Sequence, residues 1–244
     1  MNGSVIRYAE APLRLSAAGK VQEWREQTNG FALPATRSVC TYATPTCFEG
    51  CYAKKGRMKF AIPQKAYKKN YEALLNAGSV ERMAELLIDS LARVSFRVFR
   101  IHVSGDFFSV NYARAWQATC KAFPTAMFWA YTRCLDSEIL GVLRQTPNLR
   151  MLLSCDRDNW TEMLAISRDF PCFGLSYYTM GEKPPDQVYA RGNEVPAVCP
   201  QGLVVFPDQT VRRKLSLPGT CPTDLAVNPW PKQQACVKCR RCCG

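Results

Sequence analysis

The sequence predicts an α/β protein, built as a partial (β/α) barrel of about five to six parallel strands with a cysteine-rich C-terminal extension. Three observations support this prediction. Apolar runs typical of strands alternate with helical segments from residue 97 onward, as in βαβ units. The chain has 244 residues, enough for one domain with a sizeable core. Beyond residue 180 this alternation gives way to frequent prolines and cysteines.

The first third of the chain predicts one strand and two helices. A short strand is expected near Phe31–Leu33, before a loop that is rich in cysteine. Pro63 favours the first turn of a helix whose apolar positions recur as far as Leu75, and Gly78 ends it. Ser79 is a typical N-cap residue, so a second helix should follow it directly.

The rest of the core alternates regularly between strands and helices. Strands are predicted at Arg97–Ser104, Ala126–Thr132, Leu149–Ser154, Cys172–Tyr177 and Gly202–Phe206, and helices at Asn111–Phe123, Ser137–Arg144 and Trp160–Arg168. We therefore expect residues 1–180 to form the barrel core, with its three-cysteine loop near the N-terminus. Residues 181–244 should form an irregular extension, rich in proline and cysteine, that holds a second metal site.

Three cysteines, Cys40, Cys47 and Cys51, fall within one loop ahead of the predicted helices. A thiolate is a soft ligand that suits iron–sulfur clusters and zinc. Three thiolates hold three irons of a cubane [4Fe-4S] cluster and leave the fourth iron open to a small molecule. The loop therefore predicts an open-site cluster at the mouth of the barrel.

A second set of cysteines closes the chain. Its expected metal ligands are Cys221, Cys236, Cys239 and Cys242, with Cys199 and Cys243 in reserve. A C-x2-C-x2-C run with a remote cysteine next to proline resembles ferredoxin spacing. Paired C-x2-C units also hold structural zinc, so zinc is the alternative to a second [4Fe-4S] cluster in this site.

The composition of the chain indicates its cellular compartment and the class of its partner. The chain has 13 cysteines, an N-terminus without an apolar signal region, and no apolar stretch long enough for a membrane helix. We therefore expect a cytoplasmic protein whose clustered cysteines bind metal and do not form disulfides. The formal net charge of +12 favours a nucleic acid or nucleotide partner.

Polar side chains follow the predicted strands, where ligands bind in parallel α/β folds. The expected catalytic residues are His102, Asp106, Arg133, Asp156 and Arg157. An aspartate directly after Gly105 is well placed to hold an amino or hydroxyl group. Strand alternation predicts that His102 shares an inward face with Arg100, while Phe99, Ile101 and Val103 face the helices.

The motifs C-x6-C-x3-C-Y-A-K-K-G-R, H-V-S-G-D-F-F-S, W-A-Y-T-R and L-L-S-C-D-R, with the cysteine tail, together resemble the phage and plasmid gene product 88 family. The resemblance covers residues 33–244. That family is defined by sequence, so the resemblance implies a class of protein and no mechanism.

The order of cysteine loop, helix, strand ending in Gly-Asp and further βα units more distantly resembles radical S-adenosylmethionine enzymes. This resemblance implies a partial barrel, S-adenosylmethionine on the open iron and an external electron donor. Its implied cofactor-binding residues are Tyr52, Ser104, Gly105 and Asp106, and the polar strand ends add Ser154 and Ser176 as expected cofactor-binding residues. Tyr52 would pack on the adenine, and Ser104-Gly105-Asp106 would replace a Gly-Gly-Glu motif. The loop departs from the usual C-x3-C-x2-C spacing.

Three functions follow from these features. The favoured one is a radical-type iron–sulfur enzyme that acts on a nucleotide or nucleic acid, with an auxiliary C-terminal cluster. The second is a basic nucleic-acid-binding protein with structural iron–sulfur or zinc sites, in which Tyr67 and Tyr71 stack on bases between lysines. The third is a non-radical iron–sulfur enzyme whose open iron acts as a Lewis acid or carries sulfur.

Overall fold

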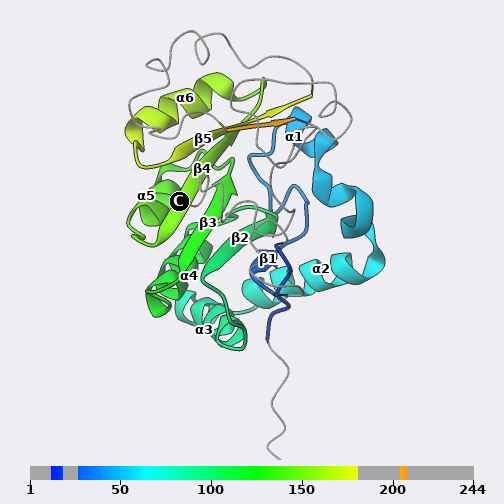
Figure 1. Cartoon of the computed structure of the whole chain (residues 1–244), viewed down its shortest axis with the longest axis vertical. Coiled ribbons are helices and arrows are strands. Elements are labelled where there is room, and N and C mark those ends of the chain that lie inside the picture. The colour runs from blue at the N-terminus through cyan, green and yellow to red at the C-terminus, as the bar shows by residue number, and fades with distance from the viewer. Residues whose placement is uncertain (1–11, 19–26, 181–203, 208–244) are drawn as a thin grey trace, which may run out of the picture.

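The computed structural model describes residues 12–18, 27–180 and 204–207. Six parallel strands form one sheet in the order of the chain. The strands are β1 (Gly30–Ala32), β2 (Val98–Ser104), β3 (Met127–Thr132), β4 (Leu149–Cys155), β5 (Gly174–Thr179) and β6 (Val204–Pro207). The predicted parallel α/β fold is therefore confirmed (Figure 1). Because β6 pairs with β5, the sheet extends beyond the predicted boundary at residue 180.

Helices precede and connect the strands. They are α1 (Pro45–Gly50), the 3-10 helices η2 (Tyr52–Lys54) and η3 (Gly56–Lys59), α2 (Ala61–Leu75), α3 (Val80–Leu91), α4 (Val110–Ala122), α5 (Ser137–Arg144) and α6 (Trp160–Asp169). Figure 1 shows α3, α4, α5 and α6 along the same side of the sheet. Sequential strand order with crossover helices on one side is the arrangement of a partial (β/α) barrel.

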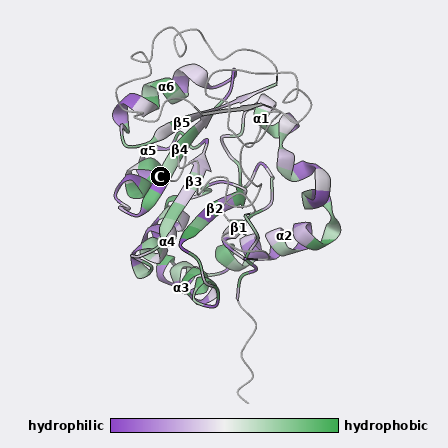
Figure 2. Ribbon diagram, viewed as in Figure 1, coloured by the Kyte–Doolittle hydropathy of each residue, from purple (hydrophilic) through white to green (hydrophobic). Residues whose placement is uncertain are grey.

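The helix starts follow the residues that predict them. Ser79 accepts a hydrogen bond from the amide of Arg82 (3.1 Å), as expected for the N-cap of α3. Ser109 and Asp136 cap α4 and α5 in the same way. In Figure 2 these helices mix hydrophobic and hydrophilic residues, as helices with one buried side do. Within the described part of the chain, no helix is both long and apolar enough to cross a membrane.

Aromatic rings fill the layer between the sheet and its helices. Trp116 of α4 is fully buried, and its ring lies 5.7 Å from that of Phe31 on β1 and 6.2 Å from that of Phe99 on β2. Phe128 on β3 joins the same cluster, 5.8 Å from Phe99. Large rings that bury together contribute much of a domain's hydrophobic stabilisation, so this layer holds the crossover helices on the sheet.

The predicted alternation along β2 fails after Ile101, because the strand contains an irregularity. Gly30 and Ala32 of β1, two positions apart, align with Arg100 and Ser104 of β2, which are four positions apart. The extra length turns His102 toward α4, where its Nε2 lies 3.0 Å from the hydroxyl of Tyr112. The prediction that His102 faces inward is therefore wrong.

The orientations of Val103 and Arg100, which flank His102 on β2, agree with this irregularity. Val103 packs beside Trp129 on the face away from the helices, so its predicted orientation is wrong as well. Arg100 does face that way, with its guanidinium carbon 5.1 Å from the Trp129 ring and 5.5 Å from the Tyr131 ring. The sheet face opposite the helices thus carries a cation among aromatic rings.

The burial of His102 predicts a loss of stability in mild acid. Burial, and next the charge of Arg100, lowers the pKa of His102 from 6.5 to about 3. The folded state therefore favours the neutral ring, and the stability linked to it is complete above pH 6.5 and is lost as the pH falls toward 3. At pH 5 this linkage costs about 2 kcal/mol.

Urea unfolding at pH 7.5 and pH 5 measures this effect. His102→Gln keeps a polar partner for Tyr112 but does not titrate, so it should lose about 2 kcal/mol less than wild type between these two values. His102 is the only histidine in the chain, so no second histidine contributes. An equal loss in both proteins would contradict the prediction.

Candidate functional site

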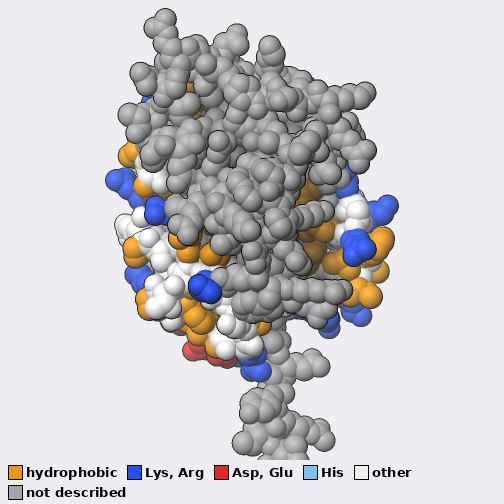
Figure 3. Space-filling view, viewed as in Figure 1, with side chains coloured by type: hydrophobic (Ala, Val, Ile, Leu, Met, Phe, Trp, Pro, Cys, Tyr) orange, Lys and Arg blue, Asp and Glu red, His pale blue; other side chains and the backbone are white. Residues whose placement is uncertain are grey.

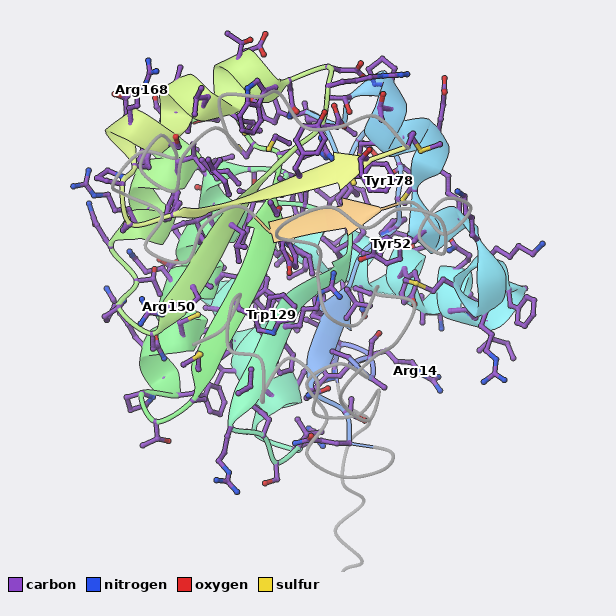
Figure 4. The ribbon with its side chains drawn as sticks, turned by 45° about the horizontal axis from the view of Figure 1, so that its top comes forward. Arg14, Tyr52, Trp129, Arg150, Arg168 and Tyr178 are labelled. Carbon is purple, nitrogen blue, oxygen red and sulfur yellow. The ribbon has the colours of Figure 1, made fainter. Side chains whose placement is uncertain are left out.

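The segment from Cys40 to Tyr52, here called the cysteine loop, lies at the carboxyl edge of the sheet. Tyr178 on β5 donates a hydrogen bond to the carbonyl oxygen of Gly50 (3.3 Å). The hydroxyl of Tyr52 donates to the carbonyl oxygen of Val103 on β2. Figure 4 shows Tyr52, the last residue of the loop, and Tyr178 near each other at this edge. The structure thus places the loop where parallel α/β folds bind ligands.

Thr44 joins the loop to the end of β4 through one hydroxyl group. This hydroxyl donates a hydrogen bond to Oδ2 of Asp156 (2.6 Å) and accepts one from the amide of Cys47 (3.0 Å). Thr44 is thereby the N-cap of α1, and Pro45 occupies the first helical position. Nearby, the amide of Thr46 donates to Asp158 (2.9 Å). The start of α1, and with it Cys47, is held by the residues that follow β4.

Asp156 is also the partner of a buried cation. Its Oδ2 lies 2.7 Å from Nη1 of Arg133, and the two side chains are 0% and 7% exposed. Its Oδ1 accepts a hydrogen bond from the amide of Asp158 (2.9 Å). A buried carboxylate is stable only when such partners replace the water it has lost. Arg133 and Asp156 therefore meet, as two predicted site residues, beneath the cysteine loop.

Asp106 ties the end of β2 to the end of β3. Its carboxylate accepts hydrogen bonds from the amide of Phe107 (2.8 Å), the hydroxyl of Thr132 (2.7 Å) and the amide of Arg133 (2.9 Å). Burial raises the pKa of Asp106, while these bonds oppose the rise. A carboxylate has about four acceptor positions, so three of them are already in use. A role for Asp106 toward a ligand or in catalysis stays a prediction.

Gly105 is required for this turn. Its φ angle is +93°, a conformation that side chains other than glycine rarely adopt. A Cβ at this position would also lie 2.6 Å from the Cβ of Leu33, which is too close. Glycine therefore lets the chain turn against Leu33 and aim the Asp106 carboxylate at β3.

The three thiols of the loop are half-buried and unpaired by disulfides. Burial raises the pKa of Cys40, and the charges of Asp106, Cys47 and Cys51 raise it further. Burial also raises the pKa of Cys47, while the guanidinium of Arg133 lowers it. The thiols are thus close enough to influence one another, and burial keeps Cys40 and Cys47 protonated at neutral pH unless a cation or metal stabilises the thiolates.

This donor set fits a soft metal centre in type and number. Within residues 12–18 and 27–180, however, no three His, Cys, Asp or Glu side chains are already gathered closely enough to hold a metal ion. A metal would have to draw the three thiols together, and the loop carries them on α1 and its two flanks. The expected C-terminal ligands Cys199, Cys221, Cys236, Cys239, Cys242 and Cys243 lie outside the described residues.

Three predicted cofactor-binding residues at the carboxyl edge of the sheet differ in their burial and in their hydrogen-bond partners. Tyr52 is 43% exposed and accepts a hydrogen bond from Nη2 of Arg100 (2.9 Å). The hydroxyl of Ser104 is buried, and it has no partner within the described part of the chain. The hydroxyl of Ser176 donates a hydrogen bond to the carbonyl oxygen of Leu153 (3.3 Å), so it bonds to the neighbouring strand β4.

Two further predicted residues lie after or near the end of β4. Ser154 is half-buried, and Arg157 is exposed with its Nε 3.2 Å from the hydroxyl of Thr46. Sequence reasoning missed Thr44, Thr46 and Tyr178, although all three hold the loop. The pair Thr44-Pro45 is a typical helix start and was the available signal for α1.

The Thr44 hydroxyl predicts a coupling between loop anchoring and the reactivity of Cys47. Thr44→Val removes a donor to the buried Asp156 and the cap of α1, so it should lower the free energy of unfolding by about 1–3 kcal/mol. It should also speed alkylation of Cys47, measured by peptide mass spectrometry after timed iodoacetamide labelling, because the start of α1 is released.

Ser79→Ala is the matched control, since it removes an N-cap hydroxyl from α3. It should cost about 1 kcal/mol without changing the labelling rate of Cys47. Equal acceleration in both variants would show that Cys47 responds to overall stability and not to Thr44.

Comparisons with known proteins place the chain in a family. A family model described as "Gene product 88" matches residues 7–243. Two proteins named "Gene 88 protein", from Mycobacterium phage D29 and Mycobacterium phage L5, are each 32% identical over 139 residues. This match covers 54% of the chain and 58% of each relative, so the chain spans less than two thirds of their length. No solved structure matches. Since the family model covers almost the whole chain, the protein belongs to the Gene product 88 family, as its motifs predict.

Proposed function

We propose that the cysteine loop binds a [4Fe-4S] cluster through Cys40, Cys47 and Cys51, and that the protein is an iron–sulfur enzyme of the radical S-adenosylmethionine type. One observation carries this proposal: three half-buried thiols are held over the carboxyl edge of a parallel α/β sheet. A cluster held there would supply an iron with one open coordination position. The nucleotide or nucleic acid substrate is part of the same proposal.

Two cations of the chain favour thiolates in this loop, while the carboxylates of Asp106 and Asp156 oppose them. The guanidinium of Arg133 lowers the pKa of Cys47, and the ammonium of Lys54 lowers that of Cys40, although burial outweighs both. Arg133 is held by Asp156, and its backbone amide is held by Asp106. A fixed cation beside the thiols offsets part of the negative charge that three thiolates bring into a half-buried loop.

The edge also offers groups for a small ligand. The Ser104 hydroxyl is buried without a partner in the described part of the chain, at the carboxyl end of β2. Gly105 follows it, but Leu33 and Val39 fill the space beside its Cα, so Gly105 shapes the turn and its contact with a cofactor stays a prediction. Tyr52 offers a partly exposed ring directly after Cys51. Together these two groups support the proposed cofactor-binding role of Tyr52 and Ser104.

Iron and sulfide content after anaerobic reconstitution tests the metal site. Wild type should bind about eight irons and eight sulfides if the proposed C-terminal cluster is also present, and Cys47→Ala should lose about four of each. Cys172→Ala is the matched control, because Cys172 is exposed and lies outside the loop. Zinc as the bound metal, or equal iron in wild type and Cys47→Ala, would overturn the proposal.

The reaction type has its own test. The reconstituted protein with dithionite and S-adenosylmethionine should form 5′-deoxyadenosine, and Cys47→Ala should form none. Absence of product, together with no spectral change when S-adenosylmethionine is added, would exclude the radical type. Turnover of a nucleotide without any reductant would instead favour the non-radical alternative, in which the open iron acts as a Lewis acid or carries sulfur.

A further inference from the structure

The segment that follows the cysteine loop is uniformly basic. Residues 52–70 contain seven lysines and arginines and no aspartate or glutamate. These seven are Lys54, Lys55, Arg57, Lys59, Lys65, Lys68 and Lys69. Lys55 lies between η2 and η3, and the other six lie on η2, η3 and α2. Charge of one sign over residues 52–70 is the electrostatic footprint of a polyanion partner, although Glu72 farther along α2 pairs with Lys68.

Six of these seven basic side chains are exposed to solvent. Lys54, Arg57 and Lys59 are exposed on η2 and η3, and Lys65, Lys68 and Lys69 are exposed on α2. We call these six residues, together with Phe60, the basic surface. On the side where Figure 1 draws α2, Figure 3 shows lysine and arginine atoms next to hydrophobic side chains. Lys65, Lys68 and Lys69 are three and four residues apart along α2, so they share one side of that helix.

An aromatic ring stands exposed in the middle of this charge. Phe60 is 56% exposed at the junction of η3 and α2, where its amide donates to the carbonyl oxygen of Arg57 (3.3 Å). Tyr52, 43% exposed, lies at the other end of the segment. Exposing a large apolar ring has a free-energy cost that a stacking partner would remove.

The structure corrects the aromatic pair expected from the sequence. Tyr67 is only 7% exposed, so it does not offer its ring to a base. Tyr71 packs edge-on against Phe108, with ring centroids 5.1 Å apart. The burial of Tyr67 makes its predicted stacking wrong, Tyr71 is half-buried against Phe108, and Phe60 is the most exposed ring of the segment.

We propose that the basic surface binds single-stranded nucleic acid, with lysines along the phosphates and Phe60 stacked on an unpaired base. Exposed rings within a positive groove or face are typical of sequence-tolerant single-strand binding. A lipid surface fits less well, because Ile62 is the last exposed apolar residue before Lys65, Lys68, Lys69 and Glu72. An amphipathic membrane helix would need a continuous apolar face.

The proposal goes beyond the iron–sulfur chemistry and does not depend on it. The basic surface begins next to Tyr52, whose hydroxyl holds the loop on β2. A strand bound there would pass beside the candidate site, which is the position that a nucleic acid substrate requires. The surface thus gives a physical basis for the partner class that the net charge of +12 only favours.

Fluorescence anisotropy with a labelled single strand of about 15 nucleotides tests the proposal in the full chain. The triple variant Lys59→Gln, Lys65→Gln and Lys69→Gln should bind at least tenfold more weakly at low salt. Its slope of log affinity against log salt should fall by about 2, because each lost single-strand contact removes about 0.7. Phe60→Ala should bind about fivefold more weakly with an unchanged slope, since it removes stacking and no charge.

The matched control removes the same charge elsewhere. Lys121→Gln, Arg144→Gln and Arg168→Gln change exposed residues of α4, α5 and α6, and binding should stay within about twofold of wild type. Equal weakening by this control, no binding by wild type, or preference for duplex DNA or for phosphatidylserine vesicles would each overturn the proposal. Cys47→Ala should bind the strand normally, so failure of the metal site and failure of this surface are distinguishable.

Discussion

The arrangement of the carboxyl edge depends on one buried carboxylate, that of Asp156. An unexposed charge is costly unless cations and hydrogen-bond donors replace its lost water. Here the replacements come from Arg133 after β3, Thr44 in the cysteine loop and the amide of Asp158. Each partner must stay in place for the others to remain satisfied, so the loop position is set by the electrostatics of the end of β4.

A second carboxylate extends this network across the sheet. Asp106, after β2, accepts from Thr132 and from the backbone amide of Arg133, whose side chain pairs with Asp156. Arg133 therefore connects two buried carboxylates that follow different strands. The ends of β2, β3 and β4 and the start of α1 form one continuous polar assembly. Such pre-organisation is what a site for a cofactor or substrate needs beneath a loop of thiols.

The elements of the fold were predictable because their signals are local. Helix starts such as Ser79 and apolar runs such as that of β3 depend on neighbouring residues, and α5 has the predicted bounds. The orientation of His102 was not predictable, because it depends on an irregular register between β1 and β2. The exposure of Phe60 and the burial of Tyr67 likewise depend on how η3 and α2 pack on the rest of the chain.

By itself, the sequence determined the α/β class, the family, the three cysteines of one loop and the basic segment that follows. Periodicity, spacing and charge are read from neighbouring residues and do not depend on contacts between distant parts of the chain. Tertiary structure alone decided what holds that loop. Thr44 and Asp156 are 112 residues apart and meet only because the parallel sheet brings its carboxyl ends to one edge. A hydrogen bond between such distant groups depends on chain closure, and no local pattern encodes it.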